Sequence, residues 1–137
     1  MTDTELYNIA VNAMKNSYAP YSGYNVGAAL LCKNGKVYTG VNVENASYSV
    51  TCCAERSALF SAVSAGEREF LKIAVAGGKN FTDSGTAYPC GICRQALSEL
   101  CGADFTVIVS ENNSLKSIKL SELMPYGFTS GELEEKS

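Results

Sequence analysis

The chain has 137 residues, with 46% hydrophobic and 18% charged residues and a formal net charge of −3. This composition is typical of one globular domain and excludes a disordered or membranous chain, so residues 1–137 are interpreted as a single domain whose last few residues fray. The acidic balance, without any basic block, argues against a nucleic-acid partner, because phosphate contacts need a basic face.

The first half of the chain predicts a helix followed by a β-hairpin. Thr2 and Glu5 have the spacing of a capping box, and apolar residues then recur on one helical face. Residues 25–32 have the pattern of a buried strand, and residues 37–44 that of the strand that returns. The Asn-Gly pair in the intervening "KNGK" is the strongest short hairpin signal.

The second half of the chain alternates strands and helices. We expect helices over 52–65 and about 91–101, strands over 70–78 and 104–110, and a short further strand over 114–120. A hairpin followed by βα units predicts an α/β fold, with a mixed, roughly five-stranded sheet and helices on its faces.

The cellular compartment bears on how the cysteines are interpreted. The N-terminal "MTDTELYN" is acidic, and no run of about 18 apolar residues occurs, so neither an export signal nor a membrane span is expected. We therefore expect a cytoplasmic protein without membrane contact. Disulfides are rare in that reducing compartment, so the six cysteines are candidates for metal or redox roles.

Three cysteines lie at the starts of the two central helices. Cys53 precedes "AERSALFSA", and Cys90 and Cys93 form a C-x-x-C pair in "YPCGICRQALSEL". A helix N-terminus carries partial positive charge, which lowers a thiol's pKa and favours the thiolate that binds metal. Three thiolates from two helix starts would hold Zn²⁺ and leave the fourth position open, as in catalytic zinc sites.

Two charged residues follow Cys53 on its helix. Glu55 would lie near the metal without having to bind it, and a carboxylate there can take a proton from metal-activated water. Arg56 lies three residues after Cys53 and so shares its helical face. We expect Arg56 to offset the negative charge of three thiolates through hydrogen bonds. The chain has no histidine, so the usual neutral-pH acid–base group is missing.

These residues also have plainer interpretations. A C-x-x-C pair alone also fits a redox dithiol or a structural zinc site. The other cysteines, Cys32, Cys52 and Cys101, are expected to be small buried hydrophobic side chains. The combination of C-A-E with P-C-x-x-C after 33 intervening residues is far more specific, and it nearly matches the pattern of zinc nucleobase deaminases.

The sequence resembles a cytidine deaminase of the small homo-oligomeric type with three cysteine ligands. The resemblance spans most of the chain and rests on "YSGYNVGAAL", "GVNVENASY", "TCCAERSAL", "PCGICRQ" and "LMPYGF". It implies a three-layer α/β/α fold and one Zn²⁺ per chain, held by Cys53, Cys90 and Cys93. The implied reaction converts cytidine and 2′-deoxycytidine to uridine and 2′-deoxyuridine plus ammonia, in pyrimidine salvage. Zinc-bound hydroxide would attack C4, with Glu55 as the catalytic proton shuttle and Arg56 tempering the thiolate charge.

The resemblance also assigns substrate-binding residues. Asn42 and Glu44 match the family's pair of contacts to ribose hydroxyls; two positions apart on a strand they share a face, although the residues alone favour a solvated strand end. Tyr24 stands where the family often has Phe near the base. Phe128 matches an aromatic that the family brings into a neighbouring subunit's site, which implies a homotetramer with shared sites; its plainer interpretation is packing of a C-terminal turn.

Three other classes of function remain as alternatives. A blasticidin-type deaminase shares the zinc pattern and size but is not expected to carry "NVEN" and "CAER" together. A polynucleotide-editing deaminase is disfavoured by the acidic charge balance. A thiol redox or structural zinc protein stands outside this class. The loop 79–88 is longer than expected, and the sequence suggests no function for it.

Overall fold

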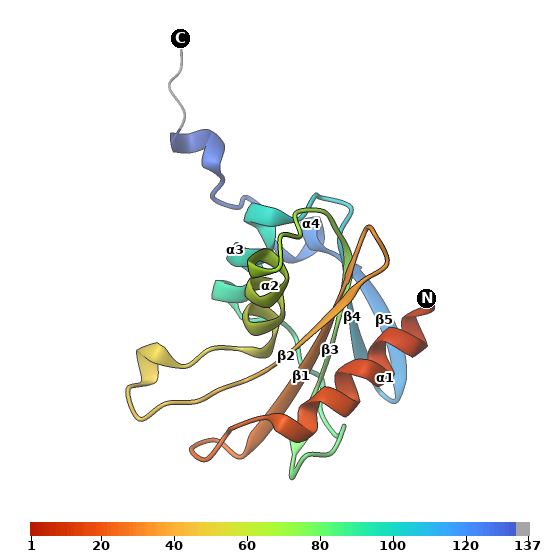
Figure 1. Cartoon of the computed structure of the whole chain (residues 1–137), viewed down its shortest axis with the longest axis vertical. Coiled ribbons are helices and arrows are strands. Elements are labelled where there is room, and N and C mark those ends of the chain that lie inside the picture. Colours follow the sequence, from red (N-terminus) through yellow and green to blue (C-terminus); the bar gives the residue numbers. More distant parts are fainter. Residues whose placement is uncertain (134–137) are drawn as a thin grey trace.

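A five-stranded sheet lies between two layers of helices in the computed structural model, which describes residues 1–133 (Figure 1). The strands are β1 (Tyr24–Cys32), β2 (Val37–Val41), β3 (Phe70–Lys79), β4 (Thr106–Glu111) and β5 (Ser114–Lys119). They lie in the order β2-β1-β3-β4-β5. β3 and β4 pair in parallel, and the other neighbours pair antiparallel. The predicted mixed sheet is confirmed.

Helices cover both faces of this sheet. The α-helices are α1 (Asp3–Ala13), α2 (Ala54–Ser64), α3 (Gly91–Leu100) and α4 (Leu120–Leu123), and short 3₁₀ turns occur at η1 (Met14–Asn16), η2 (Tyr48–Val50) and η3 (Ser130–Leu133). α1 packs on one face, and α2 and α3 lie on the other (Figure 1). No helix among the described residues is long and apolar enough to cross a membrane.

Two predictions concern the ends of the chain: the N-terminal capping box and the fraying of the last residues. The capping box is confirmed, because Glu5 N donates to Thr2 Oγ1 at 3.1 Å and Thr2 N donates to Glu5 Oε2 at 3.0 Å. The expected fraying of the last residues falls partly on 134–137, which lie outside the described residues. Residues 130–133 form the turn η3.

Strand alternation builds two hydrophobic cores, one on each face of the sheet. Side chains that alternate along a strand point to opposite faces. One core, beneath α2 and α3, contains Ala28, Leu30, Ile73, Val75, Val107 and Val109. The other, beneath α1, contains Ala29, Leu31, Ala74, Ala76 and Ile108. The near-continuous apolar runs of β1, β3 and β4 therefore reflect burial on both faces.

The predicted hairpin forms, but its second strand is shorter than expected. β1 and β2 pair through a turn at Gly35, whose φ of +91° suits a glycine. β2 ends at Val41 and not at residue 44, because the following backbone pairs elsewhere. Val43 forms isolated bridges to Tyr18 and Cys52. This exit directs residues 42–44 towards the start of α2.

The contact between β2 and α2 is unusually close. A Cβ atom at Gly40 would lie 2.3 Å from Ala58 N and 2.5 Å from Ala54 O, both in the backbone of α2. Only a glycine admits the helix at this distance. Because Cys53 is the N-cap of α2, this contact also sets where the Cys53 thiol lies.

Candidate functional site

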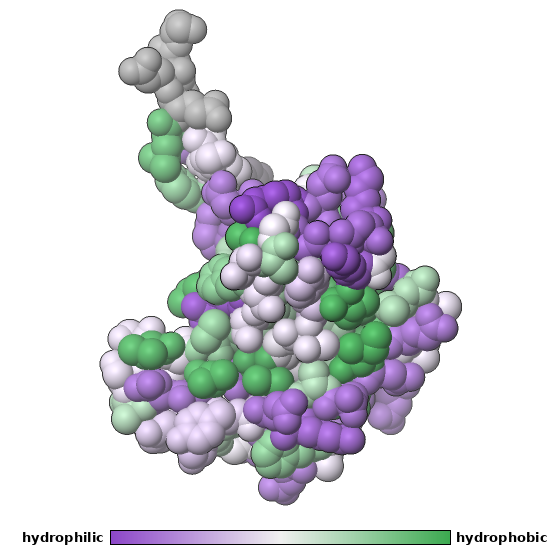
Figure 2. All heavy atoms as spheres, viewed as in Figure 1, coloured by the Kyte–Doolittle hydropathy of each residue, from purple (hydrophilic) through white to green (hydrophobic). Residues whose placement is uncertain are grey.

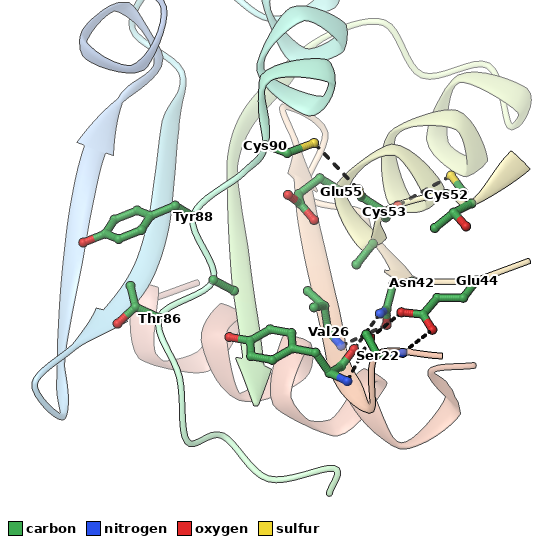
Figure 3. A pocket seen from close by; sticks show the side chains of 14 residues that line it. Ser22, Val26, Asn42, Glu44, Cys52, Cys53, Glu55, Thr86, Tyr88 and Cys90 are labelled. Carbon is green, nitrogen blue, oxygen red and sulfur yellow. Dashed lines mark hydrogen bonds between the residues drawn. The ribbon is translucent and has the colours of Figure 1, made fainter. Parts of the chain in front are cut away.

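The three predicted metal ligands come together at the starts of two helices. Cys53 is the N-cap of α2, Cys90 is the N-cap of α3, and Cys93 lies in the first turn of α3. Their sulfur atoms all lie within 4.8 Å of one another, and the Cys53 and Cys90 sulfurs are 3.7 Å apart (Figure 3). Tetrahedral zinc with Zn–S bonds of about 2.3 Å places two sulfurs about 3.8 Å apart, so the thiols fit this metal.

The charges around these thiols favour a thiolate at Cys53. Its pKa is lowered to about 5, because Cys93, Arg56 and Cys90 hydrogen-bond to the sulfur. The pKa of Cys93 is raised, because it hydrogen-bonds to the Cys53 thiolate and is buried. Arg56 Nη2 lies 3.5 Å from Cys53 Sγ and 3.3 Å from the carbonyl oxygen of Thr51. A cationic group thus faces the sulfur cluster and offsets part of the negative charge that thiolates would carry there.

Glu55 is a buried carboxylate beside the thiols. It lies in the first turn of α2 with only 4% of its surface exposed. Burial raises its pKa to about 7, since desolvation disfavours the charged form. Figure 3 shows its side chain at the same end of the cavity as Cys53 and Cys90. A carboxylate with this pKa can both accept and release a proton near neutral pH.

A single cavity connects this cluster with the predicted sugar-binding residues. Its volume is about 360 Å³, which suits one small molecule. Cys53, Cys90 and Glu55 lie at one end, and Asn42 and Glu44 lie at the other (Figure 3). The structure therefore brings together five residues that the sequence places in three separate segments.

Glu44 is held as an anion by the loop that precedes β1. Its carboxylate accepts hydrogen bonds from Tyr21 N at 2.9 Å, from Ser22 N at 3.0 Å and from the Ser22 hydroxyl. Desolvation raises the pKa of Glu44, but these three hydrogen bonds outweigh it and the pKa is lowered. Glu44 therefore presents an acceptor to the cavity at neutral pH.

Tyr24 lines the cavity, whereas Phe128 is placed elsewhere. The Tyr24 hydroxyl packs so closely on Gly85 that a Cβ there would lie 2.5 Å from it. Burial and the nearby charge of Asp83 raise the pKa of Tyr24. Phe128 is 57% exposed, and its carbonyl oxygen accepts from Gln95 Nε2 at 3.0 Å. Within the described residues, Phe128 is not part of the lining of this cavity.

Several cavity residues were not found by sequence reasoning. Thr86 and Tyr88 form the wall opposite Asn42 (Figure 3). The Tyr88 hydroxyl donates a hydrogen bond to the Glu111 carboxylate. The only signal for Tyr88 was its place just before the P-C-x-x-C motif. The prediction that Cys52 is buried is wrong, because the backbone bridge to Val43 leaves it half-buried in the cavity wall.

The other two cysteines follow the prediction. Cys32 is 1% exposed and Cys101 is 8% exposed, and both belong to the core beneath α2 and α3. Burial raises the pKa of both thiols, so they remain neutral side chains.

Comparison with known proteins adds independent findings. The family model of the cytidine and deoxycytidylate deaminase zinc-binding region matches residues 1–110. A curated cytidine deaminase from Halalkalibacterium halodurans is 44% identical over 127 residues, covering 92% of this chain and 93% of that protein. The solved structure of a cytidine deaminase from Burkholderia pseudomallei has a TM-score of 0.85 at 44% identity, covering 93% of this chain and 100% of that one. A blasticidin-S deaminase from Bacillus cereus is 33% identical over 132 residues, covering 93% of this chain and 92% of that protein.

Proposed function

The chain belongs to the cytidine and deoxycytidylate deaminase family, and we propose that it hydrolyses cytidine and 2′-deoxycytidine to their uridine products and ammonia. The observation that carries this function is a cluster of three thiols, two of which line one end of a cavity together with a buried carboxylate. Glu44 and Asn42 at the other end suit a sugar. The reaction serves pyrimidine salvage, because its substrate and product are free nucleosides.

Cys53, Cys90 and Cys93 would hold the zinc ion, one per chain. Bound zinc supplies a Lewis acid that makes water a competent nucleophile near neutral pH. Arg56 donates a charge-assisted hydrogen bond to Cys53 Sγ. This interaction draws negative charge away from the metal ligands, which favours loss of a proton from the attacking water.

Glu55 moves the protons of the reaction. It accepts a proton from the water that attacks C4 of the base and delivers that proton to ring N3. It then takes the second proton of the same water from the oxygen now bonded to C4 and delivers it to the amino group, so that the C4–N bond breaks, ammonia leaves and the C4 carbonyl forms. One carboxylate can act first as base and then as acid because these transfers occur in sequence. The burial that raises the pKa of Glu55 to about 7 suits both roles.

The substrate is positioned by residues that reach the cavity from three parts of the chain. Glu44 accepts a hydrogen bond from a sugar hydroxyl, and Asn42 contacts the same group. Tyr24 packs along the base, and its hydroxyl is held over Gly85. A free nucleoside fills such a cavity better than a polynucleotide, in keeping with the net charge of −3.

The active form is a homotetramer whose sites are completed by neighbouring subunits. Large hydrophobic side chains are exposed, with Tyr48 at 75%, Phe60 at 50% and Phe128 at 57%. Figure 2 shows hydrophobic side chains gathered across the middle of one face, with hydrophilic ones above and below. Phe128 would enter a neighbour's cavity. The six free thiols suit the reducing cytoplasm.

The first test follows cytidine by ultraviolet absorbance and counts zinc per chain by mass spectrometry. We expect conversion to uridine with about one zinc per chain. Glu55→Gln should keep the zinc and lose roughly 100-fold to 10,000-fold in kcat. Glu99→Gln, on the exposed side of α3, is the matched control. Near-normal turnover by Glu55→Gln would overturn the mechanism, and zinc without turnover would favour a structural metal site.

Blasticidin S is tested in the same assay, because one relative is a blasticidin-S deaminase. We expect cytidine to be the better substrate, since Asn42 and Glu44 both line the cavity. A higher kcat/KM for blasticidin S would reverse the assignment.

A further inference from the structure

A buried chain of hydrogen bonds lies behind Asn42, away from the metal ligands. Phe81 N donates to Asn25 Oδ1 at 3.0 Å, and Asn25 Nδ2 donates to Ser17 Oγ at 3.1 Å. Ser17 Oγ donates in turn to Asn42 Oδ1 at 2.5 Å. Ser17, Asn25 and Asn42 are 8%, 3% and 8% exposed, so water competes little for these bonds.

Two backbone groups of β1 complete the partners of the Asn42 amide. Val26 N donates to Asn42 Oδ1 at 2.9 Å, and Asn42 Nδ2 donates to the Tyr24 carbonyl oxygen at 2.8 Å. An amide oxygen has two lone pairs, and an amide nitrogen has two hydrogens. Both lone pairs of Asn42 are therefore used, and one N–H remains for the cavity. A flipped amide would set N–H against N–H at Val26 and C=O against C=O at Tyr24.

We propose that Ser17 and Asn25 are positioning residues that make Asn42 a hydrogen-bond donor only, towards the sugar hydroxyl of the substrate. This assignment rests on the proposed function, in which Asn42 and Glu44 hold the sugar. A carboxylate can only accept, so the hydroxyl donates to Glu44 and accepts from Asn42. Asn42 and Glu44 thus select a substrate group that both donates and accepts a hydrogen bond. A sugar hydroxyl does both, whereas the hydrogen atom that replaces it in a deoxy sugar does neither.

The loop 79–88 sets the direction of this chain of hydrogen bonds. Asn80 and Phe81 have φ values of +56° and +58°, and at this bend the Phe81 N–H meets the Asn25 amide oxygen. The Asn25 amide nitrogen consequently faces Ser17 and donates a hydrogen bond to the Ser17 hydroxyl oxygen. The single proton of that hydroxyl is then donated to Asn42. The hydroxyl of Tyr7 on α1 anchors the same loop by donating to Asp83 Oδ1 at 2.6 Å.

The experiment begins by identifying the hydroxyl that Asn42 contacts. Steady-state kcat and KM are measured for cytidine, 2′-deoxycytidine and 3′-deoxycytidine, with the zinc-loaded wild type and with Asn42→Ala. We expect the wild type to discriminate against one deoxy analogue and Asn42→Ala to lose that discrimination. If the wild type turns over cytidine but Asn42→Ala discriminates equally, the sugar role of Asn42 fails and so does this inference. If cytidine is not turned over at all, the proposed function itself fails.

Ser17→Ala then tests the positioning role. It frees one lone pair of Asn42 Oδ1 while the contacts with Val26 and Tyr24 remain. We expect the discrimination to fall roughly threefold to tenfold, as for loss of one hydrogen bond, with kcat/KM for the analogue within about twofold of wild type. Ser98→Ala, whose hydroxyl donates to Gln95 O within α3 at 2.8 Å, is the matched control and should change nothing. Equal loss on cytidine and analogue would show a merely structural role and overturn the inference.

A second variant tests the direction of the hydrogen bonds, because it replaces a donor in the chain with an acceptor. Asn25→Asp keeps the acceptor for Phe81 N–H but replaces the donor to Ser17 with an acceptor, so the Ser17 proton is drawn away from Asn42. We expect the same loss of discrimination as in Ser17→Ala, and no further loss in the double variant. Additive effects would overturn the inference. Melting temperatures are recorded throughout, and if Asn25→Asp does not fold, the comparison of Ser17→Ala with Ser98→Ala decides the question.

Discussion

The close contact of β2 with α2 at Gly40 allows a quantitative test of how the sheet positions the metal ligands. A Cβ at Gly40 would lie 2.3 Å from Ala58 N and 2.5 Å from Ala54 O. Both are backbone atoms, so no side-chain rotation relieves the overlap. The helix must move outward by about 1 Å to restore ordinary contact distances. Because α2 begins directly after Cys53, this movement displaces a metal ligand from its two partners on α3.

We expect Gly40→Ala to lower the free energy of unfolding by about 1–3 kcal/mol, the usual cost of overpacking. For a domain of this size the melting temperature falls by roughly 3–10 °C. We also expect less than one zinc per chain. The loss of kcat/KM should approach roughly 100-fold, because a displacement of this order disrupts catalytic geometry.

Thermal unfolding and zinc content by mass spectrometry check this prediction. Gly102→Ala is the matched control, since a Cβ there meets no atom within 4 Å and its φ is not positive. The control should retain both the wild-type melting temperature and its zinc. A Gly40→Ala protein with an unchanged melting temperature and full zinc content would refute the reasoning that this contact fixes α2.

Further predictions concern the charges, the metal and the subunit contacts. Arg56→Gln should lose zinc faster to a chelator, because it removes the donor 3.5 Å from Cys53 Sγ; unchanged zinc loss and rate would contradict this. Glu44→Gln should raise KM for cytidine roughly 10-fold to 100-fold with kcat nearly unchanged. Steady-state kinetics measure both, and a fall in kcat at an unchanged KM would contradict this prediction. Removing zinc should abolish turnover and lower the melting temperature, and added zinc should restore both. Phe128→Ala should keep zinc but lose activity, and sedimentation of the wild type as a stable, active monomer would exclude shared sites.

Local chemistry explains which parts of the molecule were predictable from the sequence. The capping box, the Asn-Gly turn and the alternation of helices and strands depend on residues near one another in the chain, and the structure bears them out. The candidate metal ligands were found for a similar reason. Cys53 and Cys90 each stand directly before a helix, where thiolates are favoured, and C-x-x-C places Cys93 one turn further on.

The end of β2 shows where this local reasoning stopped. The sequence "VYTGVNVE" reads as one strand, but β2 ends at Val41, and Val43 bridges Tyr18 and Cys52 instead. Those partners lie outside any local window. The same exit placed Cys52 in the cavity wall, against the prediction of a buried side chain.

The sequence by itself determined the chemistry available to this protein: six cysteines, no histidine, and a C-A-E segment paired with P-C-x-x-C. Only the tertiary structure decided how those groups are held. Gly40 sets the depth of α2 through contacts with residues 14 and 18 positions away. The orientation of the Asn42 amide is set by Val26 N, the Tyr24 carbonyl oxygen and the Ser17 hydroxyl, which reach it through space. Hydrogen-bond direction and backbone approach are properties of packed groups, and residue spacing along a chain does not encode them.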